Sequence, residues 1–402
     1  MTSPSTPLSQ PADTMRTHYL ILVAISLCHM INDVMQSLLA AIYPLLQAEF
    51  ALSFTQIGLM TLAFMGTASV LQPLVGLFTD RKPVPHSLAL GMGSTLSGLV
   101  LLAVGPSYPW LLTGAALIGI GSAVFHPEAS RVARAAAGGR FGTAQSLFQV
   151  GGNTGHALGP LLTAFIVVPL GRAAVAAFAA LALLGMTILA GIGRWHEGHR
   201  RAAARRPVPS APVALPRRRV VITIAVLAFL VFSKNVYTAS ISSYYIFFLI
   251  ERFALSTQAA QMMLFLFLGA AALGVMLGGI LGDRFGVRWV IWFSILGVLP
   301  FTLMLPYANL FWTGVLTVLV GFILASAFPA IVVFAQELVP GRVGMIAGLF
   351  FGLAFGIGGL AAAALGVLAD ARGIEYVYRL CSYLPALGLL TIFLPRLNRA
   401  GG

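Results

Sequence analysis

The sequence predicts an all-α membrane protein in which twelve transmembrane helices form two pseudo-symmetric bundles of six. The first indication is composition: 59% of the 402 residues are hydrophobic, 9% are charged, and the mean hydropathy is +0.94. Soluble domains carry about 25% charged residues, so this chain lacks the polar side chains needed to cover a water-facing surface. The second indication is that residues 87–125 and 289–336 contain no Asp, Glu, Lys, Arg or His. The third is an internal duplication.

Each charge-free interval is too long for one membrane crossing of about 20 residues and contains a turn, GPSYP at 105–109 or PYAN at 306–309. Each interval therefore predicts two helices joined by a short loop. Along the whole chain, apolar stretches alternate with turns and charged loops. This alternation predicts helices near 17–46, 56–79, 86–105, 109–134, 141–169, 173–193, 220–250, 256–281, 287–306, 309–335, 342–369 and 375–395. The first apolar stretch is longer than the core of a signal peptide, so we expect no cleavage.

One long polar segment, RWHEGHRRAAARRPVPSAPVALPRRR at 194–219, separates six of these helices from the other six. We therefore expect a flexible cytoplasmic tail at 1–15, an N-terminal six-helix bundle at 16–193, a cytoplasmic linker at 194–219 and a C-terminal six-helix bundle at 220–397.

Basic residues are distributed as in a multi-pass membrane protein. With both termini in the cytoplasm, nineteen of the 24 Lys and Arg residues fall on the inner side, four fall on the outer side and Lys234 lies within a helix. This bias follows the positive-inside rule, so the net charge of +13 reflects topology and indicates no nucleic-acid partner. Cys28 and Cys381 both lie in predicted helices, which implies no disulfide framework.

The two halves are copies of one repeat. A shift of 202 positions aligns His126-Pro127 with Phe328-Pro329, and GRFG at 139–142 with GRVG at 341–344. GLFTDR at 76–81 and ILGDRFGVR at 280–288 match within one further position. Duplicated bundles around a site at the membrane midplane are a transporter architecture, in which rocking exposes the site to each side in turn.

These two loops resemble the Gly-x-x-x-Asp-Arg-x-Gly-Arg motif of the major facilitator superfamily. The resemblance implies a cytoplasmic gate, in which small residues let helices touch and charged residues close the inner side. The gate residues would be Asp80, Arg81, Asp283, Arg284 and Arg288. The first copy departs from the motif, because Lys82-Pro83 replaces the second glycine. Simple positive-inside residues are the alternative explanation.

Further segments resemble the fosmidomycin-resistance branch of that superfamily: HMIND at 29–33, LSFTQIGL at 52–59, HPEASRVA at 126–133 and QSLFQVGGNTGHALGPLL at 145–162. The resemblance implies a monomeric, proton-driven antiporter of the bacterial inner membrane that exports anionic phosphonate drugs and other toxic compounds. It implies no cofactor besides the proton gradient. GHALGP at 155–160 also resembles the antiporter motif Gly-x-x-x-Gly-Pro, although glycine rows on this helix and on 342–369 fit close helix packing equally well.

Polar residues inside predicted spans are functional candidates because a bilayer penalises them. They form two stripes at helical spacing, which we expect to face the bundle interior and a translocation path. One stripe contains His29, Asn32, Asp33 and Gln36, and the other contains Gln145, Gln149, Asn153 and His156. Hydrogen bonding between helices is the alternative role for such residues.

His126, Glu128 and Arg131 exist in one half only, since the other copy has Phe328, Ala330 and Val333. A purely architectural requirement would appear in both copies, so we interpret these three residues as groups with a chemical role. A charge pair at the helix end, contributing to topology, is the competing explanation. The proline is kept in both copies and is expected to shape or bend its helix.

We predict that Asp33, His126, Glu128, Arg131 and His156 couple transport to protons. Lys234 is the one charged residue deep in the C-terminal half, and it suits either an anionic substrate or a salt bridge to Asp33. The predicted substrate contacts are His29, Asn32, Gln36, Gln149, Asn153, Lys234, Asn235, Tyr237 and Tyr244.

Three alternatives remain open. The same buried groups would serve a proton-coupled symporter that imports an organic anion. His29, Asp33, His126 and Glu128 could instead ligate a metal in a membrane enzyme, although no HExxH motif occurs and we expect neither a metal nor an enzyme. A scaffold or receptor without transport fits poorly with a buried charge in each half.

Overall fold

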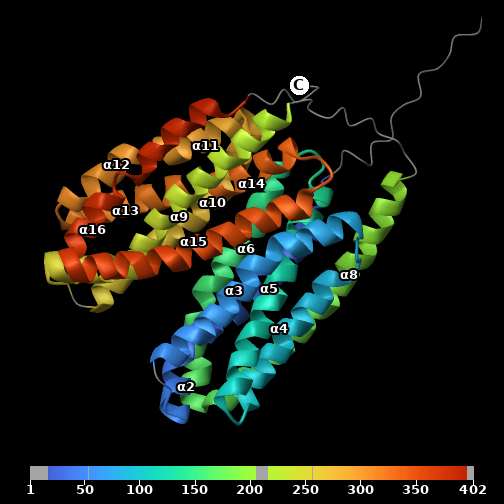
Figure 1. Cartoon of the computed structure of the whole chain (residues 1–402), viewed down its shortest axis with the longest axis horizontal. Coiled ribbons are helices and arrows are strands. Elements are labelled where there is room, and N and C mark those ends of the chain that lie inside the picture. Colours follow the sequence, from blue (N-terminus) through green and yellow to red (C-terminus); the bar gives the residue numbers. More distant parts are fainter. Residues whose placement is uncertain (1–16, 53, 205–215, 256, 396–402) are drawn as a thin grey trace, which may run out of the picture.

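The computed structural model describes residues 17–52, 54–204, 216–255 and 257–395, and these residues are helical nearly throughout, with no β-strand among them. The predicted tail at 1–15 lies outside the described residues. The chain forms two lobes that correspond to the two sequence halves (Figure 1).

Six membrane-crossing units make up the N-terminal half. Some are interrupted helices, which follow one another as α1 (Tyr19–Ala41) with α2 (Tyr43–Phe50), α3 (Phe54–Arg81), α4 (Ser87–Val104), α5 (Tyr108–Ala136), α6 (Phe141–Leu162) with the π-helical turn η2 (Thr163–Val167) and α7 (Val168–Leu170), and the 3₁₀ turn η3 (Arg172–Ala177) with α8 (Phe178–Ala204).

The C-terminal half repeats this plan. Its elements are α9 (Arg217–Phe253), α10 (Thr257–Phe285), α11 (Val287–Leu296) with α12 (Leu299–Met304) and the 3₁₀ turn η4 (Leu305–Tyr307), α13 (Leu310–Ala325) with α14 (Ala327–Leu338), α15 (Val343–Arg372), and α16 (Ile374–Cys381) with the 3₁₀ segment η5 (Leu384–Phe393).

Twelve crossing units therefore agree with the predicted fold class. Eleven segments of the described chain are long and apolar enough to cross a membrane by themselves. The remaining unit, α6 with η2 and α7, is continuously helical from 141 to 170. It carries the polar stripe of Gln145, Gln149, Asn153 and His156, which lowers its hydropathy. The protein is a multi-pass membrane protein.

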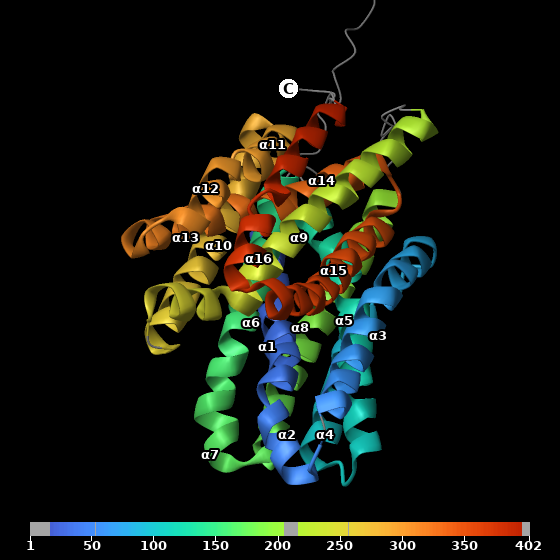
Figure 2. The same cartoon turned by 60° about the vertical axis from the view of Figure 1, so that its left-hand side comes forward.

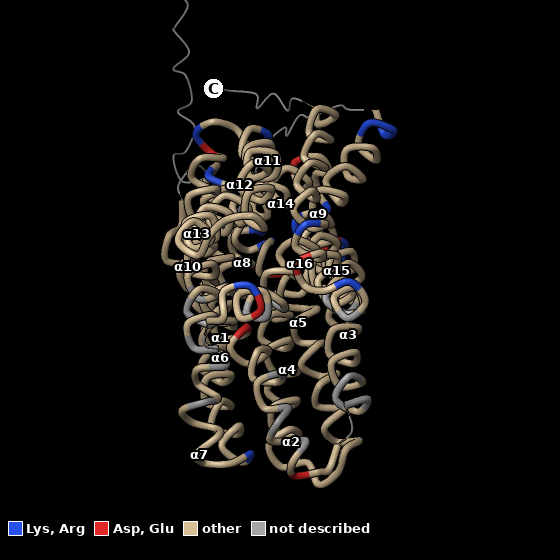
Figure 3. The backbone as a smooth tube through the Cα atoms, turned by 90° about the vertical axis from the view of Figure 1, so that its left-hand side faces the viewer, with Lys and Arg blue, Asp and Glu red and all other residues tan. Residues whose placement is uncertain are grey.

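The two halves touch where α15 packs against α3 and α5, and where α6 packs against α10 and α14. Away from these contacts the lobes diverge, as Figures 1 and 2 show. Lys and Arg residues gather at the end of the molecule from which the C-terminal trace leaves (Figure 3).

Two details differ from the predicted spans. The predicted helix 309–335 is divided between Ala325 and Ala327, because Pro329 lacks an N–H and its ring clashes with the carbonyl four residues earlier. The equivalent Pro127 lies inside the uninterrupted α5. The predicted linker 194–219 is helical at both ends, since α8 continues to Ala204 and α9 begins at Arg217, while residues 205–215 lie outside the described residues.

Glycine sets the spacing of neighbouring helices within the N-terminal half. A Cβ atom built on Gly98 of α4 would lie 2.5 Å from the Gly114 carbonyl oxygen of α5. The two backbones therefore touch directly, and a side chain at this point would force them apart.

We expect Gly98→Ala to destabilise the fold by about 1–3 kcal/mol, the usual cost of overpacking. Gly191→Ala on α8 is the matched control, because a Cβ there meets nothing within 4 Å. The measurement is the thermal unfolding midpoint of both purified variants in detergent. Equal midpoints would contradict the direct contact of α4 and α5.

Candidate functional site

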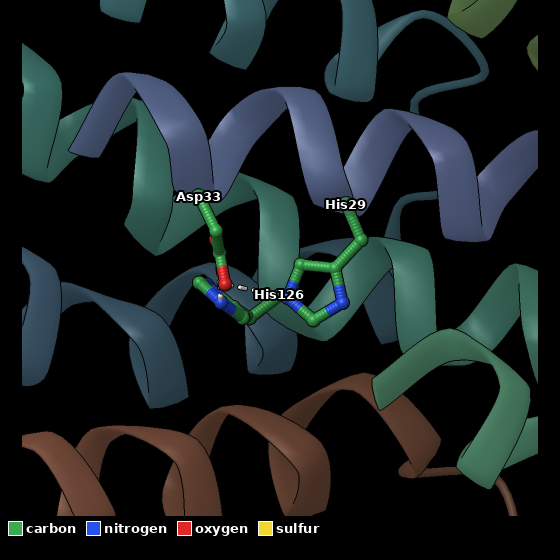
Figure 4. A group of neighbouring side chains, drawn as sticks. All are labelled: His29, Asp33 and His126. Carbon is green, nitrogen blue, oxygen red and sulfur yellow. Dashed lines mark ion pairs between the residues drawn. The ribbon is translucent and has the colours of Figure 1, made fainter. Parts of the chain in front are cut away.

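A buried carboxylate lies at the centre of the N-terminal half. Asp33 of α1 is 3% exposed, and three imidazoles surround it, which together we call the Asp33 cluster. His29 Nε2 lies 3.2 Å and His156 Nδ1 lies 3.0 Å from Oδ2, whereas His126 Nε2 lies 3.8 Å from Oδ1. Figure 4 shows His29 and Asp33 projecting from one helix toward His126. The predicted stripe on α1 therefore faces the bundle interior.

Amide groups complete the surroundings of this carboxylate. Asn32 Nδ2 and Gln36 Nε2 donate to Asp33 Oδ1 at 3.0 and 3.2 Å. Gln36 Oε1 in turn accepts from the Ser122 hydroxyl of α5 at 3.2 Å. Asn32 and Gln36, predicted to contact substrate, are 0% and 2% exposed and bind the carboxylate in this conformation.

Backbone carbonyls fix the orientation of two imidazoles. His29 Nδ1 lies 2.7 Å from the Phe148 carbonyl oxygen, and His126 Nδ1 lies 3.0 Å from that of Ser122. A carbonyl oxygen can only accept, so each Nδ1 carries a proton. Each Nε2 then faces Asp33, and a proton placed between ring and carboxylate would be shared by them. These contacts place the titratable Nε2 atoms of two imidazoles beside one buried carboxylate.

Glycines of α6 make room for the cluster. A Cβ on Gly152 would lie 2.5 Å from His29 Cε1 and 2.7 Å from Asp33 Oδ2, and one on Gly155 would lie 2.3 Å from the Met30 carbonyl oxygen. The close approach of α6 to α1 depends on these residues, as the predicted packing role of the glycine row requires.

A cavity of about 570 Å³ lies between the two halves. Its N-terminal wall is α6, and its C-terminal wall is formed by α9, α10, α13, α14 and α15. Aromatic and aliphatic side chains dominate the lining, which includes Phe267, Phe328, Phe351 and Phe355. A space of this size and character is typical of a small-molecule site.

His156 joins the cluster to the cavity. Its side chain is 47% exposed and lines the cavity, while Nδ1 faces the buried Asp33 carboxylate. His29 and His126 are 2% and 1% exposed. In this conformation, water in the cavity therefore reaches the cluster at His156.

The predicted substrate residues fall into two groups. Gln149, Asn153, Lys234 and Asn235 line the cavity. Tyr237 is 1% exposed in the hydrophobic core of the C-terminal half, and neither it nor Tyr244, nor His29, is part of the lining. Their contact with substrate stays a prediction.

Lys234 supplies a cation to the cavity wall. Its Nζ lies 5.6 Å from the centre of the Phe328 ring, and in the described part of the chain no carboxylate lies within ion-pair distance of it. The alternative salt bridge to Asp33 is therefore not formed in this conformation. The charge is available to a bound anion.

The halves are held together at one end by carboxylates that bind helix N-termini. Asp80 of α3 accepts from the backbone N–H groups of Gly344 and Met345, at 3.0 and 2.8 Å, at the start of α15. The N-terminus of a helix carries partial positive charge, so each such contact is favourable. Arg131 Nη2 lies 2.5 Å from Asp80 Oδ1.

The second copy makes the same contact in the opposite sense. Asp283 of α10 accepts from the N–H groups of Gly142 and Thr143 at the start of α6, at 2.9 and 2.8 Å, and from the Thr143 hydroxyl at 2.7 Å. The predicted basic gate residues behave differently. Arg81 and Arg284 are exposed, and within the described ranges neither they nor Arg288 forms an ion pair.

Glu128 and Arg131 form the pair that their spacing suggested. Arg131 Nη1 lies 2.6 Å from Glu128 Oε1, and the Ser87 hydroxyl donates to Glu128 Oε2 at 3.1 Å. Because Arg131 also binds Asp80, this pair belongs to the closed end of the molecule and not to the Asp33 cluster. Its predicted role in proton coupling stays a prediction.

Ligand atoms of His29, Asp33 and His126 lie within 4.8 Å of one another, close enough to hold a metal ion. Glu128, the fourth ligand of the metalloenzyme hypothesis, binds Arg131 and Ser87 instead. The carboxylate already accepts two amide N–H groups and faces a third imidazole, so we interpret the cluster as a proton site.

Two duplicated bundles, a central cavity and a buried titratable cluster at its wall define a membrane transporter, not an enzyme. The family model described as Major Facilitator Superfamily matches residues 25–260 and 228–401, and the chain belongs to this superfamily.

Known relatives agree with this assignment and confirm the predicted branch. The chain is 59% identical over 380 residues to the fosmidomycin resistance protein of Escherichia coli (strain K12), covering 94% of each chain. It is 41% identical over 385 residues to an MFS-type transporter of Bacillus subtilis (strain 168), covering 94% of this chain and 93% of that one. Among solved structures, FucP in the outward conformation matches with a TM-score of 0.74 at 16% identity, covering 94% of this chain and 99% of that one.

We expect Asp283→Asn to open the closed end, because the amide loses the charge that binds the α6 N-terminus, a contact of about 0.3–2 kcal/mol. Ser146→Cys on α6, introduced with Cys28→Ala and Cys381→Ala, reports this opening through its rate of thiol labelling. Glu197→Gln, which removes an ion pair to Arg201 on α8, is the control. If the introduced thiol is labelled equally slowly in the Asp283→Asn and Glu197→Gln proteins, Asp283 does not hold this end closed.

Proposed function

We propose that this protein is a proton-coupled antiporter of the bacterial inner membrane that exports fosmidomycin-like anionic phosphonates and other toxic compounds by alternating access. The observation that carries the proposal is His156, which faces the buried Asp33 carboxylate at 3.0 Å and lines the central cavity. One side chain thus links protonation to occupancy of the cavity.

The proposed orientation places both termini and the carboxylate-bound helix ends in the cytoplasm. Positive-inside charge supports this orientation, and the basic end of the molecule in Figure 3 is the closed one. The cavity then opens toward the outside, so the structure represents an outward-facing carrier. Asp80 and Asp283 would act as its cytoplasmic gate.

Lys234 supports an anionic substrate. A phosphonate oxygen that binds an ammonium group forms a charge-assisted hydrogen bond, which is stronger in an apolar cavity than in water. Gln149, Asn153 and Asn235 line the same cavity and offer further amide groups. The relative named as a fosmidomycin resistance protein supports export, since a transporter confers resistance by removing a drug.

Coupling requires that protonation favour one conformation over the other. Protons from the acidic outer side would reach Asp33 through His156 in the outward-facing carrier. We expect the protonated, empty carrier to return to the cytoplasm-facing state, where proton release precedes binding of the next substrate molecule.

Uptake by symport is the second candidate, and one observation favours it. A proton added at His156 places positive charge on the cavity wall, where it attracts an anion. Export requires the opposite relation between proton and substrate. In inside-out vesicles, fosmidomycin accumulation driven by an acidic lumen supports export, whereas accumulation driven by an alkaline lumen supports uptake.

We expect Asp33→Asn to abolish transport driven by a pH gradient in proteoliposomes, because the cluster then loses the carboxylate that makes it bind protons. Substrate exchange without a gradient should persist, since the cavity is unchanged. Glu197→Gln on the exposed end of α8 is the control. Gradient-driven transport by the Asp33→Asn protein would overturn the coupling mechanism.

We expect Lys234→Gln to weaken fosmidomycin binding about tenfold or more, because a hydrogen bond to a charged group contributes about 1.5–3 kcal/mol. Lys82→Gln in the exposed loop after α3 is the matched control. The measurement is the dissociation constant in detergent. Equal constants for both variants would remove Lys234 from the site.

A further inference from the structure

We propose that the Asp33 cluster has two separate proton ports: His156 exchanges protons with the cavity in the present conformation, and His126 exchanges them with the opposite side after the halves rock. This inference rests on the proposed proton coupling and assigns each imidazole a direction.

The two carboxylate oxygens face different imidazoles. Asp33 Oδ2 lies 3.0 Å from His156 Nδ1, and Oδ1 lies 3.8 Å from His126 Nε2. A proton taken up on the His156 side can therefore leave from the other side of the same carboxyl group. Rotation of the carboxyl about its Cβ–Cγ bond closes the longer of these two gaps.

Exposure differs sharply between the two imidazoles. The His156 side chain is 47% exposed, and the His126 side chain is 1% exposed. In this conformation only the first of them exchanges protons freely with water in the cavity. Both lie beside one carboxylate, so their difference in exposure reflects the position of the halves.

His29 and Phe125 of its own half pack on one part of the His126 ring, and two rings of the opposite half cover another part. Its ring centre lies 5.0 Å from that of Phe351 and 5.4 Å from that of Phe355, both on α15. The start of α15 is bound to Asp80 at the closed end. Rocking that frees this helix end also moves the two phenylalanines away, and it uncovers His126.

The position of His126 along α5 suits exchange at that end. It precedes Arg131, which binds Asp80, by five residues or roughly 7.5 Å along the helix. The titratable groups packed against it are Asp33 and His29 of α1 and His156 of α6, whereas α15 contributes, among its described side chains, the two phenylalanine rings above.

The proton balance of the route is simple. His156 passes a proton to Asp33 Oδ2 and regains one from the cavity. Rotation of the carboxylic acid about its Cβ–Cγ bond turns the protonated oxygen toward His126, and this oxygen passes its proton to Nε2 of His126. His126 becomes an imidazolium because Nδ1 keeps its own proton, which it donates to the Ser122 carbonyl oxygen. After rocking, Nε2 releases the proton to water.

The first test is chemical modification of imidazoles with diethyl pyrocarbonate in the purified full-length protein, followed by peptide mass spectrometry. In the wild type, His156 should react about tenfold faster than His126, in line with its access to the cavity. In a protein carrying Asp80→Asn and Asp283→Asn, which releases both helix ends, His126 should become reactive and His156 should become slower.

Reactivity of His156 reports whether the double variant has changed conformation. If His156 becomes protected while His126 stays unreactive, the second port does not exist. If His126 already reacts as fast as His156 in the wild type, the two ports are not separate. If the double variant leaves His156 as reactive as before, the functional test below decides.

The second test separates the two imidazoles by function, with fosmidomycin as the substrate. His156→Gln should lose both the proton exchange that accompanies fosmidomycin addition in detergent, measured with a pH dye, and gradient-driven transport in proteoliposomes. His126→Gln should keep the dye signal, but its rate of gradient-driven transport should fall about tenfold, because protons enter but cannot leave. His199→Gln at the cytoplasmic end of α8 is the control.

The two-port assignment would be overturned if both variants lost the dye signal and gradient-driven transport. Unchanged transport by His126→Gln would also overturn it. Failure of the proposed function gives a different result, because the wild type itself would then show no gradient-driven transport of fosmidomycin. The modification test would still report on the exposure of His126.

Discussion

An ionised carboxylate in a membrane-spanning bundle must be compensated, and the arrangement of the N-terminal half follows from how Asp33 is compensated. Two amides on its own helix and three imidazoles from three helices converge on it. Full burial of such a group without partners would cost several kcal/mol. The glycines of α6 bring this helix close enough to α1 for these contacts, so compensation of the charge depends on close helix packing.

The same principle explains the closed end. Asp80 and Asp283 each bind the N-terminus of a helix in the other half, which offers partial positive charge without a basic side chain. Such contacts are moderate in strength and depend on geometry, so rotation of the halves in the proposed transport cycle would break them. A latch of this kind holds one conformation and still permits the other, as a carrier requires.

Much of this organisation is predictable from the sequence. Hydropathy and turns give the twelve crossing units, and the spacing of His29, Asn32, Asp33 and Gln36 predicts one interior stripe. Partners between distant helices are not predictable in this way. The motif pairs Asp80 with Arg81 in sequence, but Arg131 of α5 is the guanidinium that binds it.

The residues that line the cavity could not be predicted from the sequence, for a different reason. A phenylalanine in an apolar helix carries no signal that distinguishes a cavity from lipid or core, so Phe267, Phe351 and Phe355 could not be singled out. Tyr237 shows the converse: its hydroxyl suggested a polar contact in the cavity, and in this conformation its side chain is buried in the core of the C-terminal half. Side-chain type predicts polarity, and only helix rotation decides which surface a residue faces.

Divergence of the duplicated halves gives each a distinct task. The N-terminal copy keeps the titratable groups, whereas the C-terminal copy places Lys234 and aromatic rings at the cavity, with Phe328 in the position equivalent to His126. In the proposed mechanism, the proton site lies in the N-terminal half and the cation for an anionic substrate lies in the C-terminal half. Communication between them must therefore cross the interface, where His156 lines the cavity and His126 packs on α15. Movement of one half against the other changes the surroundings of both imidazoles at once, which is the physical condition for coupling.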